Sequence, residues 1–172
     1  MARTAEKLDK VTPDKPKIEF DPVDTIKKQK APGKSNYKMQ PSLDIIKQSY
    51  LREAGDEKGY DQFMRKLASL LQNPDIRLVR FLNTMFLIMK ISDEVAEIKI
   101  FTIDPPDLIA ITVRDAAQLL QKNGFKKAVS ASNLPAYVEV AKQTGLPVKI
   151  SQGQMVMGNQ AVPSYVFELD LQ

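Results

Sequence analysis

The chain has 172 residues, with 25 Lys and Arg against 21 Asp and Glu, which gives a formal net charge of +4. It contains no cysteine and no histidine, which excludes disulfide frameworks, thiolate nucleophiles, Ser-His-Asp triads and the usual zinc and haem ligands. No apolar run approaches the ~18 residues of a membrane span, and the first ten residues lack an apolar signal-peptide core. We expect a soluble protein that is not secreted through a signal peptide.

The excess of positive over negative charge lies in the N-terminal part of the chain. Residues 1–42 hold ten basic and six acidic side chains, whereas residues 43–172 hold fifteen of each. Five of the 11 prolines also lie in residues 1–42. Apolar residues come singly there, so this segment cannot offset the entropy of folding by itself. We therefore predict an extended basic arm, rich in Pro and Lys, over residues 1–42 and a single α+β domain over residues 43–172.

The arm is predicted to dock on another protein. Its isolated apolar residues are spaced as the anchors of an extended peptide would be: Ile18, Phe20, Val23, Ile26, Tyr37 and Met39. Nucleic acid is the alternative partner, because a series of lysines could neutralise phosphates. These lysines are Lys27, Lys28, Lys30, Lys34 and Lys38. A solubilising tail is the remaining interpretation.

The first half of the domain is predicted to contain two helices followed by three strands. Apolar residues at helical spacing predict helices over residues 42–54 and 60–72, with a charged turn between them. The period then changes, and β-rich segments follow at residues 76–81, 84–91 and 95–103.

The second half alternates helices and strands. Its predicted elements are a helix over residues 107–122, a strand over 125–130, a helix over 134–144 capped by Asn133, and strands over 146–150 and 163–171. Residues 152–161 are expected to form an apolar loop or hairpin edge. The order α-α-β-β-β-α-β-α-β-β predicts a mixed, mostly antiparallel sheet flanked by helices.

Two local segments resemble the acyl-CoA N-acyltransferase family. The run from Asn133 to Leu146 is similar to the family's Asn, Ala, Tyr, Lys and Gly pattern in the helix before its sixth strand, with one extra residue before the glycine. Residues 123–127, Asn-Gly-Phe-Lys-Lys, resemble the helix end that leads into the family's fifth strand. The resemblance implies a GNAT-like fold over about residues 59–171.

The chemistry that this resemblance implies is not matched by the residues present. The family's CoA loop uses glycines so that backbone N–H groups can bind the pyrophosphate, but the corresponding residues 104–109 hold two prolines, two carboxylates and no glycine. The family's tyrosine general acid corresponds to Val140, and Tyr137 lies one helical turn earlier and is expected to face elsewhere. Glu97 is the in-strand candidate for a general base and is expected to be solvated. We therefore expect no catalytic, cofactor-binding or metal-binding residue.

These absences favour a non-enzymatic structural or assembly protein, of the kind found in bacteriophage virions, located in the virion or the host cytoplasm. Its predicted partners are other subunits of a large assembly, with no membrane and no small-molecule substrate. The alternative is a CoA-dependent N-acyltransferase with an atypical pyrophosphate loop. A second alternative is a nucleic-acid-binding adaptor that acts through the arm.

Overall fold

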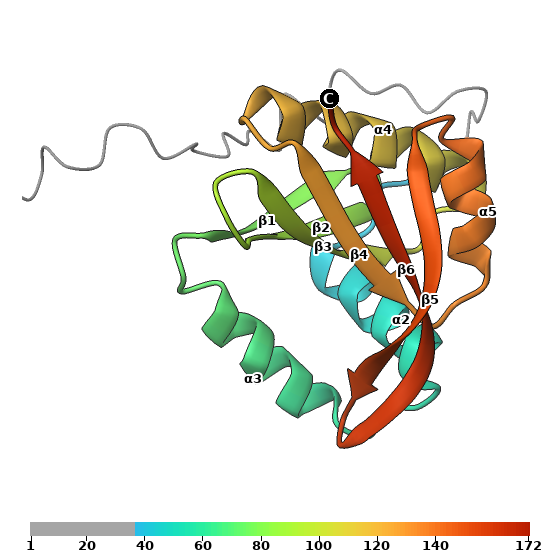
Figure 1. Cartoon of the computed structure of the whole chain (residues 1–172). Helices are drawn as coiled ribbons and strands as arrows, with labels where there is room; N and C mark the ends of the chain where they lie inside the picture. Colours follow the sequence, from blue (N-terminus) through green and yellow to red (C-terminus); the bar gives the residue numbers. More distant parts are fainter. Residues whose placement is uncertain (1–36) are drawn as a thin grey trace, which may run out of the picture.

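The computed structural model describes residues 37–172 (Figure 1). The elements follow in the order α2 (Ser42–Ala54), α3 (Tyr60–Leu70), β1 (Ile76–Phe81), β2 (Thr84–Lys90), β3 (Val95–Thr102), α4 (Pro106–Lys122), β4 (Lys127–Ser132), α5 (Ala136–Gln143), β5 (Val148–Met157) and β6 (Gln160–Asp170). This confirms the predicted order of helices and strands.

The strands form one six-stranded sheet in the order β1-β2-β3-β4-β6-β5. Every neighbouring pair is antiparallel except β3 and β4, which run parallel. This parallel pairing covers only three residue pairs, from Val95↔Lys127 to Glu97↔Val129. Beyond Glu97 and Val129 the two strands are no longer paired with each other. The prediction of a mixed, mostly antiparallel sheet is confirmed.

The helices cover both faces of the sheet, because the strands are apolar on both sides. On β2, Phe86 and Ile88 point to the face covered by α4. The alternate residues Met85 and Leu87 pack against α2 and α3 on the other face. Helix α5 packs beside α4, where Val140 joins a small apolar cluster on that helix. The sheet therefore lies between two helical layers in the described part of the chain (Figure 1).

Several local predictions differ from the structure; β5 begins at Val148 rather than at residue 146, and β6 begins at Gln160 rather than at residue 163. The strand expected over residues 125–130 is β4, which begins two residues later at Lys127. Asn133 does not cap α5, which begins at Ala136 after Pro135 and has no side-chain cap. Residues 152–161 form the outer half of the β5–β6 hairpin, paired from Gly153↔Ser164 to Met157↔Gln160, because the backbone can turn at Gly158 with φ 63°.

Most of the predicted arm contacts lie outside the described residues: Ile18, Phe20, Val23, Ile26, Lys27, Lys28, Lys30 and Lys34. Of the others, Lys38 and Met39 are exposed, and the Tyr37 hydroxyl donates to Asp104 of the chain's own domain at 2.6 Å. Docking of the arm on a partner and the division at residue 42 remain predictions. Within residues 37–172, none of the helices has the length and apolar character needed to cross a membrane.

Candidate active site

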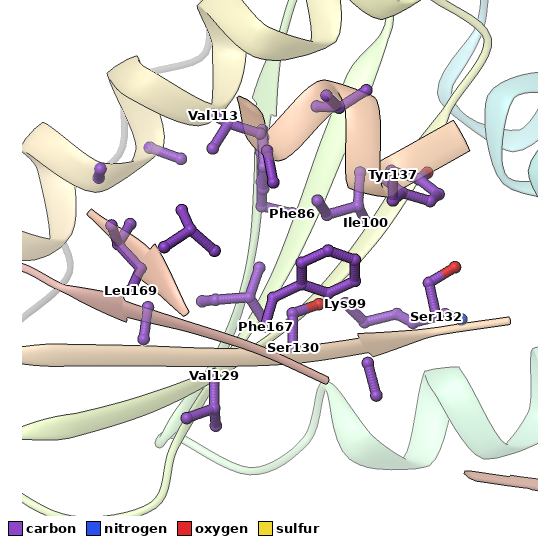
Figure 2. A pocket seen from close by; sticks show the side chains of 18 of the residues that line it. Phe86, Lys99, Ile100, Val113, Val129, Ser130, Ser132, Tyr137, Phe167 and Leu169 are labelled. Carbon is purple, nitrogen blue, oxygen red and sulfur yellow. The ribbon is translucent and has the colours of Figure 1, made fainter. Parts of the chain in front are cut away.

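A cavity of about 100 Å³ lies where β3 and β4 separate. Its walls come from these two strands, from α4 and α5 above them, and from β6 (Figure 2). Most of the lining is apolar, with Ile100 on β3, Val113 on α4 and Phe167 on β6 among the side chains. The early end of the β3–β4 pairing therefore leaves a gap in the sheet that side chains do not fill.

The cavity passes through the sheet from one face to the other. Ile98 and Ile100 belong to the apolar cluster under α4. Lys99, between them, points to the opposite face, where its Nζ meets the Glu53 carboxylate of α2. Ile98, Ile100, Lys99 and Glu53 all line the same cavity. The lining of the cavity therefore comes from both faces of the sheet.

The backbone edge of β3 also faces this gap. The Thr102 N–H donates to Ser49 Oγ at 3.2 Å, so it points away from the neighbouring β2 strand. Backbone direction alternates with a period of two residues along a strand. The N–H and C=O of Ile100 therefore point into the gap, beyond the last residue pair with β4. An extended chain with amide groups can pair with this edge as an added strand would.

Glu53 and Lys99 form a largely buried ion pair at the cavity. The Lys99 Nζ and Glu53 Oε2 atoms are 2.5 Å apart, and the side chains are 26% and 10% exposed. The two residues lie 46 positions apart in sequence, one at the end of α2 and the other in the middle of β3. No local pattern links them, so the sequence analysis missed both.

Tyr137 lines the cavity from α5, together with Val140. The expectation that Tyr137 faces elsewhere is wrong, because residues three apart on a helix share a face. Burial, and then the negative charge of Glu53, raise the pKa of Tyr137 above its usual range. Its hydroxyl therefore stays protonated at neutral pH, in the wall of the cavity. Glu97, the candidate base in the sequence, is exposed and does not line the cavity.

The first turn of α4 stands at the end of the gap, just after β3. Pro105 precedes the helix and Pro106 begins it, and neither has an N–H group. The N–H groups of Leu108 and Ile109 both donate to the Pro105 carbonyl, each at 3.0 Å. This helix end therefore offers few free donors to an anion.

The Asp104 carboxylate is buried beside this turn. It accepts hydrogen bonds from the Tyr37 hydroxyl at 2.6 Å, the Asn83 N–H at 3.0 Å and the Thr84 hydroxyl at 2.9 Å. Arg80 extends the same polar cluster, since its guanidinium donates to Asn83 Oδ1 at 3.0 Å, and burial lowers the pKa of Arg80. These contacts hold Asp104 inside the protein as a structural group.

No family model and no curated protein match the chain. Among solved structures, it matches a probable acetyltransferase from Staphylococcus epidermidis with a TM-score of 0.56 and 9% identity, over 74% of this chain and 90% of that one. It also matches a GNAT family acetyltransferase from Elizabethkingia anophelis with acetyl-CoA bound, with a TM-score of 0.47 and 11% identity, over 80% of this chain and 94% of that one. An N-acetyltransferase from Staphylococcus aureus matches with a TM-score of 0.43 and 14% identity, over 54% of this chain and 62% of that one, which is less than two thirds of its length.

These matches correct the functional prediction. The prediction of a non-enzymatic phage structural protein is wrong, because the fold is that of a probable acetyltransferase and no match supports a virion protein. The prediction of no small-molecule substrate depended on the non-enzymatic interpretation and is corrected together with it. The sequence reasoning compared positions along the chain, whereas Glu53, Lys99 and Tyr137 come together only in space, in the wall of the cavity. The similarity establishes the fold, which is that of the acyl-CoA N-acyltransferases.

Proposed function

We propose that this protein is an acyltransferase that moves an acyl group from a thioester of the acyl-CoA class to an amine. The observation that carries the proposal is the cavity that crosses the sheet, with Glu53, Lys99 and Tyr137 in its wall. The acetyltransferase fold supports the same class of reaction. An apolar interior suits the acyl group and its thioester, and the polar side chains suit the proton transfers of the reaction.

The two faces of the sheet support separate entry of the two substrates. The apolar half of the cavity, under α4 and α5, takes the donor, with the Ile100 backbone edge beside it. The half next to Glu53 takes the acceptor, because a carboxylate attracts an ammonium group. Lys99 holds the Glu53 carboxylate in place through the 2.5 Å contact. The nitrogen and the acyl carbon are thereby brought together inside the gap.

Each proton has an assigned carrier among the residues of the chain. A thioester supplies an activated acyl carbon and a sulfur leaving group. Glu53 accepts a proton from the acceptor nitrogen, which then forms its bond to the acyl carbon as the carbon–sulfur bond breaks. Tyr137 donates its proton to the departing sulfur and takes up the second proton that the nitrogen loses as the amide forms. Glu53 then releases its proton to the solvent, so an ammonium and a thioester give an amide, a free thiol and one proton.

Thiol release tests this function whichever amine is the acceptor, because the thiol always comes from the donor. The chain contains no cysteine, so a thiol-reactive dye reports only the thiol that leaves the donor. Acetyl-CoA is the first donor to test, against a panel of primary amines. General acid–base groups contribute about 10²–10⁴-fold to a rate, so we expect losses in that range for Glu53→Gln and Tyr137→Phe.

Two matched variants serve as controls. Glu139→Gln removes an exposed carboxylate that pairs with Lys142 at 3.0 Å, and Tyr60→Phe removes a hydroxyl on α3, away from the cavity. Both should keep the rate of the unaltered chain. Equal rates for Glu53→Gln and Glu139→Gln would remove Glu53 from the reaction. The absence of thiol release with every amine and of acetyl-CoA binding by calorimetry would refute the proposed function.

A further inference from the structure

The site suits one part of an acyl-CoA donor and does not suit the other part. This difference concerns the donor of the proposed reaction. An acyl-CoA consists of an acyl-pantetheine arm, which is an extended chain with two amides and a thioester, and a nucleotide joined to it through a diphosphate. The gap between β3 and β4 suits the first part. It combines an apolar cavity with an unpaired strand edge at Ile100, and an extended diamide can pair with such an edge.

The place next to the open end of the gap does not suit a diphosphate. An anion at a helix N-terminus is held by backbone N–H groups that point outward. In the first turn of α4, Pro105 and Pro106 have none, and the amides of Leu108 and Ile109 are directed to the Pro105 carbonyl. The Asp104 N–H is also occupied, because it donates to Thr102 Oγ1 at 3.0 Å.

The acidic residues at the first turn of α4 also disfavour the binding of an anion there. Asp104 is 4% exposed, and its hydrogen-bond donors Tyr37, Asn83 and Thr84 are all neutral groups. Asp107 adds an exposed carboxylate in the first turn of α4, where it already complements the positive end of the helix dipole. A diphosphate here would meet the exposed Asp107 carboxylate and few free donors.

We propose that the enzyme recognises its donor by the acyl-pantetheine arm alone, so that it accepts pantetheine thioesters that carry no nucleotide diphosphate. Such an arm can be a free small molecule or can be attached through a single phosphate to a carrier protein. Both sources share the chemistry that the gap binds. The proposal rests on the proposed acyl transfer and adds the identity of the group that is bound.

The test compares three donors in the thiol-release assay with the full chain and one fixed amine. The donors are acetyl-CoA, S-acetyl-pantetheine, and a carrier protein whose phosphopantetheine arm is acetylated. We expect kcat/KM for acetyl-pantetheine to lie within about threefold of that for acetyl-CoA, or above it. A higher value for the carrier protein identifies the protein-bound arm as the source, and equal values identify the free thioester; both support the proposal.

A preference for acetyl-CoA of roughly 100-fold, which two charge-assisted hydrogen bonds to the diphosphate would produce, overturns the proposal. In that case the acyl transfer itself stands. If no donor releases thiol with any amine, the proposed function fails and takes this inference with it. The two failures are therefore distinguished by the same measurement.

A charge-reversal variant tests whether the diphosphate of acetyl-CoA lies beside α4. Asp107→Lys should raise kcat/KM for acetyl-CoA severalfold and leave that for acetyl-pantetheine unchanged, because only the former carries the diphosphate past α4. Asp61→Lys is the matched control, since it makes the same change in the first turn of α3. Identical effects of the two variants, or an equal effect of Asp107→Lys on both donors, would contradict the placement of the diphosphate beside α4.

Discussion

Filling the cavity should abolish acyl transfer and leave the fold intact, and Ala117→Leu is the variant that tests this. Ala117 is buried on α4 and lines the cavity. Leucine adds three carbon groups, which occupy roughly 90 Å³ if each takes about 30 Å³, as a water molecule does in the liquid. The cavity has about 100 Å³, so the larger side chain fits only by taking the space of the donor.

The expected free energies follow from the same volume. Burial of three carbon groups stabilises by about 2 kcal/mol at ~0.8 kcal/mol each, and imperfect packing costs about 1–3 kcal/mol. The free energy of unfolding should therefore stay within about 1 kcal/mol of the unaltered chain. Ala110→Leu is the control, because Ala110 is buried on the same helix against Ile109 and Val140 but does not line the cavity. It should cost about 1–3 kcal/mol.

Urea unfolding and thiol release measure the two effects. For Ala117→Leu we expect near-normal unfolding and a loss of transfer of about 100-fold or more, since displacement of a reacting group by about 1 Å can have that effect. If Ala117→Leu destabilises as much as Ala110→Leu, the space is not open to a ligand. If it folds normally and still transfers the acyl group, the donor does not bind in this cavity.

Three further predictions concern stability. Asp104→Asn should lower the free energy of unfolding by about 1.5–3 kcal/mol, because it weakens the charge-assisted hydrogen bond from Tyr37; a change below about 0.5 kcal/mol in urea unfolding would contradict its structural role. The raised pKa of Tyr137 means that the folded chain keeps a proton that the unfolded chain releases above pH ~10. The resulting stabilisation is present below that pH and is lost as the pH rises, so Tyr137→Phe should lose less stability between about pH 10 and 11; parallel curves would refute the shift. Gly59→Ala should cost more than Gly55→Ala: both glycines have positive φ, 86° and 83°, but only at Gly59 would a Cβ approach Tyr50 Oη, at 3.2 Å. Equal melting temperatures would show that the approach to Tyr50 carries no cost.

The order of elements could be predicted because its signals are local. The apolar spacing of Phe63 and Leu67 and the change to a two-residue period after it depend only on neighbouring residues. The predicted boundaries of elements were wrong where tertiary contacts determine where an element begins. Phe125 looked like the start of a strand, but its N–H bonds to Leu120 at the end of α4 and its side chain packs into the cluster under that helix. It therefore belongs to the helix end, and β4 begins after it.

The candidate site could not be predicted, because it depends on where the sheet opens. Nothing in the sequence marks the end of the pairing at Glu97 and Val129, yet this end creates the cavity. Glu53 and Lys99 meet only because α2 crosses the face to which Lys99 points. The sequence predicts that Tyr137 faces away from Val140, but residues three apart on a helix share a face, and both side chains line the cavity.

The short contact between β3 and β4 also divides the sheet into two halves. The strands on its two sides, β1–β3 and β4–β6, are each continuous in sequence and fully paired within themselves. Three residue pairs join these two half-sheets, with α4 lying over the junction. The two half-sheets are therefore held together less by strand pairing than by the apolar cluster that α4 shares with both of them.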